Sequence, residues 1–315
     1  MSARPLPALA PTSRPRTTFA SLAGQKASGT PIAMVTAYDY PSAQIADAAG
    51  VDIVLVGDSA AMTVLGYDST VPVTVDEMLM LTAAVRRGLT TPLLVADLPF
   101  GSYEVSDEQA VATAQRFIKA AGADAVKIER GGSSVDRARA IVAAGIPVMG
   151  HVGLTPQTAA TIGGYRSQGR TADEALAVHD SAVALQGAGC FALVFEAIPT
   201  AATAAIMPHI AIPVIGIGAG PDTDGQVLVF HDLLGTHDGR PARFVKRYAD
   251  LREPMIAAVA AYAGEVRSHG YPLPEHGYAM PSAESARLAT LLADRGRRRA
   301  AAPSSRAVGD SSIAS

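Results

Sequence analysis

Residues able to bind metal ions or move protons recur at one kind of position in this sequence, the end of a short apolar run. The runs are rich in β-branched residues, as strands buried on both faces are. Carboxylates bind hard cations, and carboxylates, lysine and histidine transfer protons. The residues at these positions are Asp58 and Ser59, Asp97, Lys127 and Glu129, His151, Glu196, and His231 with Asp232.

The run ADAVKIE (123–129) is the most informative of these positions. Because successive side chains of a strand point to opposite faces, Lys127 and Glu129 share one face. Two charges on a buried face are costly unless they pair or bind something. The pattern therefore indicates either a structural ion pair or a ligand site.

Asp58 and Asp97 each have a structural explanation, because an aspartate after a strand often caps the next helix or turn. Together with Glu129 and Glu196, however, they would bring four carboxylates to one site, where like charges repel without a cation. Oxygen ligands with open positions favour Mg²⁺ over Ca²⁺ or Zn²⁺. We predict a Mg²⁺ site that polarises a 2-oxo acid and stabilises its enolate, with Glu196 available as the base.

The elements that must position these residues alternate along the chain, with a helical stretch after most of the apolar runs. Eight such runs predict a (β/α)8 barrel, and an open doubly wound sheet is the competing architecture. In such barrels the chemistry lies at the C-terminal ends of the strands, where the residues above fall. The runs are 31–39, 51–59, 92–100, 123–129, 146–153, 190–199, 212–220 and 226–235.

Two long loops follow the second and fifth runs, at 60–74 and 152–170. Both exceed the usual length of a loop between strand and helix, which favours a lid or a binding role.

The composition narrows the class of protein. The chain has 315 residues and a formal net charge of −3, so nothing indicates nucleic acid or an acidic membrane as a partner. Its one cysteine, Cys190, excludes an intrachain disulfide and a cysteine-based metal site. The uncharged stretch 197–221 contains four prolines, so we expect no membrane span and a cytoplasmic protein.

The ends of the chain differ in composition from its middle. Residues 1–18 are rich in proline and arginine and predict a disordered tail. We expect the catalytic barrel over 19–280, and over 281–315 a C-terminal helix that frays into a disordered tail.

Several long motifs, in this order and spacing, resemble the ketopantoate hydroxymethyltransferase family over about residues 17–278. That family belongs among barrels related to phosphoenolpyruvate mutase and isocitrate lyase. The motifs include VTAYDYPSAQIADAAGVDIVLVGDS, LLVADLPFGSY, AVKIE, GHVGLTPQ, GGYRSQGR, FEAIP and IPVIGIGAG.

The resemblance implies a reaction: a hydroxymethyl group passes from 5,10-methylenetetrahydrofolate to 3-methyl-2-oxobutanoate, giving 2-dehydropantoate for pantothenate and coenzyme A synthesis. It also implies a homo-oligomer, often a decamer. Arg130 departs from the family, which usually has glycine there, and leaves the loop after the fourth strand unassigned. The implied roles are Mg²⁺ binding for Asp58, Asp97 and Glu129, some through water; substrate binding for Ser59 and Lys127 with Asp58 and Asp97; proton acceptance for Glu196; and an active-site position for His151.

Three alternatives stay open. The runner-up is a folate-independent, Mg²⁺-dependent aldolase or lyase on the same barrel. A Schiff-base aldolase using Lys127 would survive EDTA and be trapped by borohydride. A non-catalytic barrel could sense a 2-oxo acid, although a sensor has no need of a base beside a metal.

Overall fold

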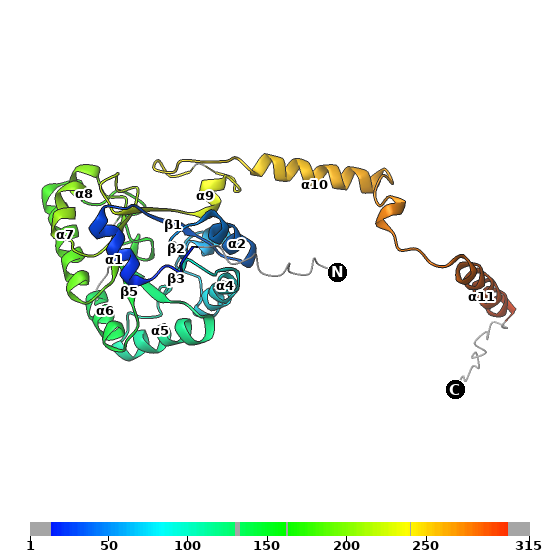
Figure 1. The fold of residues 1–315 in the computed structure, drawn as a ribbon, viewed down its shortest axis with the longest axis horizontal. Helices are drawn as coiled ribbons and strands as arrows, with labels where there is room; N and C mark the ends of the chain where they lie inside the picture. Colours follow the sequence, from blue (N-terminus) through cyan, green and yellow to red (C-terminus); the bar gives the residue numbers. More distant parts are fainter. Residues whose placement is uncertain (1–13, 130–132, 162, 240, 302–315) are drawn as a thin grey trace, which may run out of the picture. The chain divides into compact units, whose positions relative to one another are not determined.

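The computed structural model describes residues 14–129, 133–161, 163–239 and 241–301. Eight parallel strands form a closed barrel in chain order, with β8 paired to β1 (Figure 1). This confirms the predicted (β/α)8 barrel and excludes an open sheet. Arg130 and most of both predicted tails lie outside the described residues. The strands are β1 (Ile32–Thr36), β2 (Ile53–Val56), β3 (Leu93–Asp97), β4 (Ala125–Glu129), β5 (Val148–Gly153), β6 (Ala192–Glu196), β7 (Val214–Ile217) and β8 (Gly225–Leu228).

Helices follow most strands and cover the outside of the barrel (Figure 1). Local signals set their ends: the side chains of Thr74, Ser106 and Thr171 accept backbone N–H groups at helix starts, and Gly50 and Gly122 adopt left-handed φ at helix ends. The helices of the barrel are α1 (Phe19–Ser28), α2 (Tyr40–Ala49), α3 (Ala60–Thr63), α4 (Val75–Gly88), α5 (Asp107–Ala121), α6 (Ser134–Ala143), α7 (Ala172–Gly187), α8 (Thr200–Ile206) and α9 (Phe230–Leu234), with 3-10 turns η1 (Pro156–Thr158) and η2 (Met207–His209).

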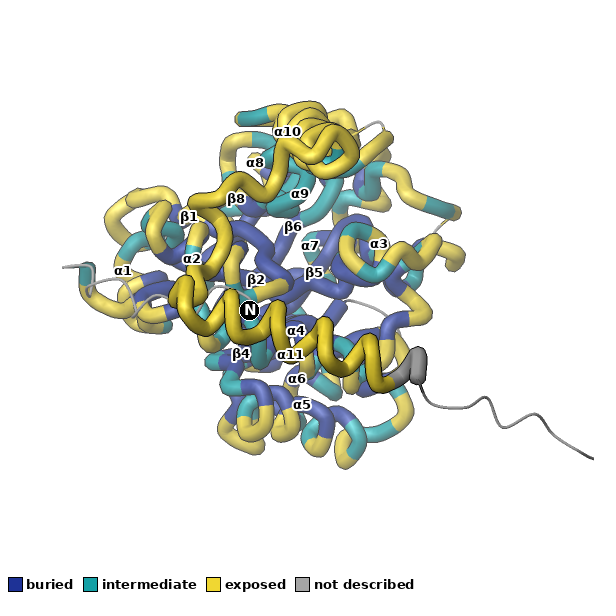
Figure 2. Tube along the Cα trace, turned by 90° about the vertical axis from the view of Figure 1, so that its right-hand side faces the viewer, coloured by how far each residue is buried: buried dark blue, intermediate teal, exposed yellow. Residues whose placement is uncertain are grey.

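The inward-facing side chains change from apolar to charged along the strands. In β4, Ala125 belongs to the apolar cluster inside the barrel, while Val126 and Ile128 pack in the outer cluster beneath the helices. The same alternation turns Lys127 and Glu129 inward, toward the C-terminal end. Strands β2 to β5 are buried throughout, as the dark blue in Figure 2 shows, whereas Ala33 of β1 and Gln226 of β8 are exposed. The apolar layer therefore forms the core, and the charged layer above it forms the site.

Helix α1, which the sequence did not indicate, packs against the other end of the barrel. Leu22 is fully buried in the inner cluster, and the ring of Phe19 meets that of Phe191 edge-on at 4.8 Å between centroids. The sequence assigned residues 14–18 to the tail, but the backbone N–H of Thr17 donates to the carbonyl of Thr91 at 2.8 Å. This segment and α1 therefore close the N-terminal end of the barrel.

The last apolar run departs from expectation. Strand β8 ends at Leu228, and the short helix α9 follows, ended by Gly235 in a left-handed conformation. His231 and Asp232 therefore lie on a helix and not at the end of a strand. The described residues between β7 and β8, 218–224, include no helix.

The chain divides into two compact units, 1–252 and 253–315, whereas the sequence suggested a barrel domain ending at 280. Nearly all of α10 (Arg252–Arg267), and all of η3 (Pro274–His276) and α11 (Ser282–Ala301), belong to the second unit. Helix α10 has no buried residue. None of the described helices is both long enough and apolar enough to cross a membrane.

Candidate active site

The C-terminal end of the barrel holds a cavity of about 500 Å³. The structure brings all the residues that the sequence assigned to a site to the wall of this one cavity. They come from the ends of strands β2 to β6 or directly after them. These residues are Asp58, Ser59, Asp97, Lys127, Glu129, His151 and Glu196.

The register of the parallel strands sets which of these side chains meet. Asp97 of β3 lies beside Lys127 of β4, and Glu129 of β4 lies beside His151 of β5. Neighbours in register on one face of a sheet have side chains within contact distance. The contacts in the site therefore follow from the barrel itself and do not depend on flexible loops.

Lys127 is the cation at the centre of the site, and its side chain is only 4% exposed. Its Nζ lies 2.9 Å from Asp97 Oδ1 and 3.3 Å from His151 Nδ1. Burial lowers the pKa of Lys127, but the charges of Asp97, Glu129 and Asp58 outweigh burial and raise it. Lys127 is therefore protonated at neutral pH. The buried ion pair considered from the sequence exists, but its acid is Asp97 and not Glu129.

The carboxylates are crowded. Burial, together with the charges of Asp97 and Glu129, raises the pKa of Asp58 well above its usual range. Burial also raises the pKa of Asp97, although Lys127 and the backbone N–H of Asp58, which donates to Asp97 Oδ2 at 3.0 Å, act against it. Both shifts show that this site disfavours further negative charge and favours a bound cation.

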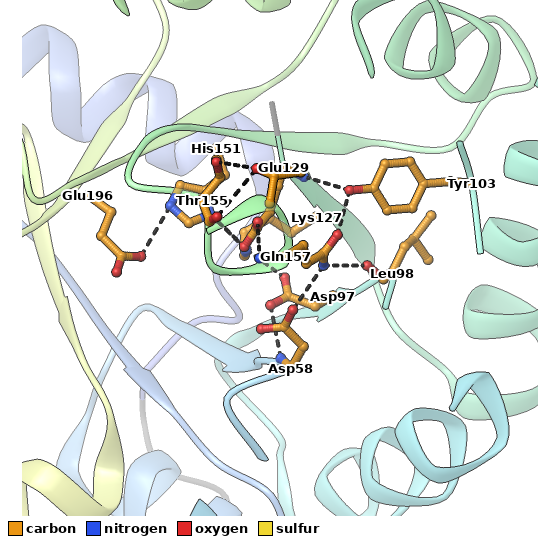
Figure 3. Close-up of polar contacts among 11 residues, drawn as sticks. Asp58, Asp97, Leu98, Tyr103, Lys127, Glu129, His151, Thr155, Gln157 and Glu196 are labelled. Carbon is orange, nitrogen blue, oxygen red and sulfur yellow. Dashed lines mark hydrogen bonds and ion pairs between the residues drawn. The ribbon is translucent and has the colours of Figure 1, made fainter. Parts of the chain in front are cut away.

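His151 joins two of the acids, as Figure 3 shows. Its Nδ1 lies 3.4 Å from Glu129 Oε1, and its Nε2 lies 3.2 Å from Glu196 Oε2. Burial and the charge of Lys127 lower the pKa of His151, but the contacts with Glu129 and Glu196 outweigh them and raise it to about 9. The imidazole therefore connects Glu129 with Glu196 and restricts the orientation of both carboxylates.

Three further residues support the site, and sequence reasoning did not single them out. Tyr38 contacts Ser59, with 2.7 Å between the two hydroxyl oxygens. Gln157 and Tyr103 are buried beside Asp58 and Glu129. Gln157 stands in the motif GHVGLTPQ, but no pattern or spacing within that motif indicates where its side chain points.

The outer part of the cavity is built by the two long loops and by the segment after β8. Met62 and Thr70 of the first loop and Tyr165 of the second line it, in agreement with a binding role for both loops. From the segment after β8, Val229 and Phe244 line the cavity together with Asp232, His237 and Asp238. This part of the lining therefore mixes apolar and polar side chains.

The donor atoms at the base fit a hard divalent cation. Among the described residues, no group of three or more His, Cys, Asp or Glu side chains is placed so that all of them could hold one metal ion. Mg²⁺ is commonly held by one or two carboxylates and keeps several waters, so it does not require a closed cage. The crowded oxygen donors Asp58, Asp97 and Glu129 suit such an open site.

Solved structures of low sequence identity share this fold. A phosphonopyruvate hydrolase matches with a TM-score of 0.56 at 15% identity, over 92% of this chain and 100% of that one. A 2,3-dimethylmalate lyase of the PEP mutase/isocitrate lyase superfamily matches with a TM-score of 0.51 at 16% identity, over 90% of this chain and 99% of that one. These likenesses show that the barrel fold is shared.

Sequence relatives are much closer. The chain is 54% identical over 265 residues to 3-methyl-2-oxobutanoate hydroxymethyltransferase of Moorella thermoacetica, across 84% of this chain and 98% of the relative. It is 53% identical over 245 residues to the enzyme of that name from Saccharopolyspora erythraea, across 78% and 83%. Residues 16–274 match the family model described as ketopantoate hydroxymethyltransferase. The chain therefore belongs to the ketopantoate hydroxymethyltransferase family.

Proposed function

We propose that this enzyme transfers a hydroxymethyl group from 5,10-methylenetetrahydrofolate to 3-methyl-2-oxobutanoate, giving 2-dehydropantoate for pantothenate and coenzyme A synthesis. The observation that carries the proposal is the joining of Glu196, through His151, to a buried group of acids around Lys127. Such a site contains a base, a fixed positive charge and oxygen donors for a cation, which forming and using an enolate requires.

Mg²⁺ is the ion that the proposal requires, and Asp58, Asp97 and Glu129 would hold it, some of them through water. When bound, Mg²⁺ would polarise the ketone of the oxo acid and offset the negative charge of the enolate. The crowding of these three acids supports this assignment.

Glu196 is the proposed proton acceptor for C3 of the oxo acid. Its side chain is 16% exposed and lines the cavity, so it can reach a bound substrate. The contact of Glu196 Oε2 with His151 leaves the other carboxylate oxygen to take the proton. His151 then acts by orienting Glu196.

Lys127 and Ser59 are proposed to bind the oxo acid together with Asp58 and Asp97. Because Lys127 is protonated and paired with Asp97 at 2.9 Å, it suits electrostatic stabilisation of an anion. The same pairing argues against Lys127 as a Schiff-base nucleophile, which must lose its proton before it attacks.

The size of the cavity supports a second, larger substrate. A volume of about 500 Å³ falls within the usual range for ligand sites and exceeds what a five-carbon oxo acid fills. Apolar side chains in the lining, such as Met62, Val229 and Phe244, suit the flat ring system of a folate. The enolate at the base would attack the methylene carbon presented from the mouth. Both carbon–nitrogen bonds of that methylene group break, a water molecule supplies the hydroxyl group, and tetrahydrofolate leaves with the C3 proton and one proton of the water.

The test is turnover of 3-methyl-2-oxobutanoate with 5,10-methylenetetrahydrofolate, in Mg²⁺ and then in EDTA. We expect 2-dehydropantoate only in the sample with Mg²⁺. Failure with folate, from a folded protein that binds Mg²⁺, would favour the folate-independent aldolase or lyase. Activity that persists in EDTA, with covalent trapping by borohydride, would favour the Schiff-base alternative.

We further propose that the enzyme is a cytoplasmic homo-oligomer, decameric as members of its family often are. Light scattering of the full chain gives its mass directly. A monomer would contradict this proposal without affecting the assignment of the reaction.

A further inference from the structure

Gln157 is buried in η1, next to the acids proposed to hold Mg²⁺, and the proposed chemistry gives it no task. Its backbone N–H donates to Glu129 Oε2 at 2.9 Å. Its side-chain Nε2 donates to Asp58 Oδ2 at 2.9 Å and to the carbonyl oxygen of Leu98 at 3.0 Å (Figure 3). One residue thus holds an oxygen of two different carboxylates.

The orientation of the Gln157 amide is determined by its neighbours. The hydroxyl of Tyr103 donates to Gln157 Oε1 at 2.6 Å and accepts the backbone N–H of Glu129 at 3.3 Å. A backbone carbonyl only accepts hydrogen bonds, so the amide must present its NH₂ group to Leu98, and the same group then faces Asp58. Tyr103 therefore fixes the amide, and the amide fixes Asp58.

We infer that Gln157 is a positioning residue for the Mg²⁺ site. Asp58 and Glu129 line the same cavity and carry charges of the same sign when both are ionised, so they then repel each other. Two N–H groups from one residue hold these carboxylates together, so the donor oxygens keep their relative placement before the ion binds. Residues that orient metal ligands in this way commonly contribute 10- to 100-fold to metal affinity or activity.

The inference rests on the proposed function, because it assumes that Asp58 and Glu129 bind Mg²⁺. A purely structural role is the alternative, in which Gln157 only ties the loop after β5 to the carbonyl of Leu98. That role predicts a less stable protein with unchanged metal affinity. The two roles can therefore be separated by measuring both quantities.

The experiment uses Gln157→Met in the full chain. Methionine has a similar length but no amide, and the backbone N–H to Glu129 is retained. We expect the dissociation constant for Mg²⁺, measured by calorimetry without substrate, to rise about 10- to 100-fold. In turnover assays the half-saturating Mg²⁺ concentration should rise by more than kcat falls.

Gln186→Met is the matched control. Gln186 lies on α7, outside the barrel, where its Oε1 accepts the N–H of Ala211 at 2.7 Å and that of Ile212 at 3.3 Å. The same chemical change should lower the melting temperature there and leave Mg²⁺ affinity as in the unmodified chain.

Tyr103→Phe supplies a second and milder variant, because it frees the amide without removing it. It should weaken Mg²⁺ binding by less than Gln157→Met, and the double variant should bind no worse than Gln157→Met alone. Unchanged Mg²⁺ affinity in folded Gln157→Met would overturn the inference. If Gln157→Met does not fold, unchanged affinity in Tyr103→Phe would do so. Absence of Mg²⁺ binding by the unmodified chain would instead overturn the metal site of the proposed function.

Discussion

The two ends of the barrel differ in how their acidic side chains are paired with basic ones. At the N-terminal end three aspartates, each directly before a strand, meet basic side chains supplied mainly by the segment before β1. In each case the carboxylate also accepts a backbone N–H from the neighbouring strand. The pairs are Asp52 with Arg14 and the N–H of Ala33, Asp124 with Arg16, Arg86 and the N–H of Leu94, and Asp224 with Lys26 and the N–H of Val214.

At the C-terminal end, the acids around Lys127 outnumber the bases. Four carboxylates meet one lysine and one histidine there, and two of the carboxylates have raised pKa values. The two groups of acids therefore differ in whether the basic side chains around them balance their charge. Acids at the N-terminal end have partners within the chain, whereas acids at the C-terminal end leave a deficit of positive charge that a ligand can fill.

Among the substitutions that test this difference, Glu196→Gln should have the largest effect, and that effect is on kcat. Removing the proposed base should lower kcat by about 10²- to 10⁴-fold. Calorimetry should still show Mg²⁺-dependent binding of 3-methyl-2-oxobutanoate, since the acids proposed to hold the ion are unchanged. Glu108→Gln, at an exposed position in the first turn of α5, is the matched control and should keep full activity. Near-normal kcat in Glu196→Gln would remove Glu196 from the role of base.

Stabilisation by Mg²⁺ should depend on the acids at the C-terminal end of the barrel and not on those at the N-terminal end. At a concentration of 100 times its dissociation constant, it should stabilise the unmodified chain by about 2.7 kcal/mol. Chemical unfolding with Mg²⁺ or with EDTA measures this increment. Asp58→Asn should lose it and Asp124→Ala should keep it. An equal increment in both variants would place the metal away from Asp58.

Asp124→Ala removes contacts only at the N-terminal end of the barrel. Asp124 lies 2.5 Å from Arg16 and 3.2 Å from Arg86, and it accepts the N–H of Leu94 at 2.9 Å. Losing these contacts should lower the free energy of unfolding by about 1–3 kcal/mol. Urea titration measures this, while kcat of the folded protein should stay within about twofold. A large loss of kcat would show that the two ends are coupled.

The smallest expected effect is a gain in stability, whereas the preceding substitution should lower it. In EDTA, Asp58→Asn should be more stable than the unmodified chain. The reason is that asparagine removes a buried negative charge which burial, Asp97 and Glu129 all disfavour. Thermal unfolding in EDTA tests this directly. A destabilised variant would mean that the hydrogen bond from Gln157 outweighs the repulsion.

The barrel and most of its site could be predicted because both depend on local alternation. In β4 and β6, the pattern that turns Ala125 and Ala192 into the core also turns Lys127, Glu129 and Glu196 inward. The end of an apolar run in the sequence therefore marks the position of a side chain in space. The resemblance to a family independently indicated the same residues.

The features that could not be predicted from the sequence depend on contacts between distant segments. Gln157 meets Asp58 across 99 residues, and Tyr103 meets Gln157 across 54 residues. Neither residue lies on a strand, so no periodicity constrains its direction. Helix α1 was missed for a similar reason: Leu22 alone of its residues is buried, and one buried residue produces no amphipathic pattern.

Closure of the N-terminal end by α1 also has a kinetic consequence. In the described part of the chain, Leu22 and the apolar layer close that end, so under the proposed function we expect both substrates to enter and leave at the C-terminal end. If the oxo acid binds at the base and the folate above it, a folate that arrives first would trap an empty site beneath it. We therefore expect an ordered reaction with the oxo acid first and inhibition by excess folate. Product-inhibition patterns would reveal random entry if this expectation is wrong.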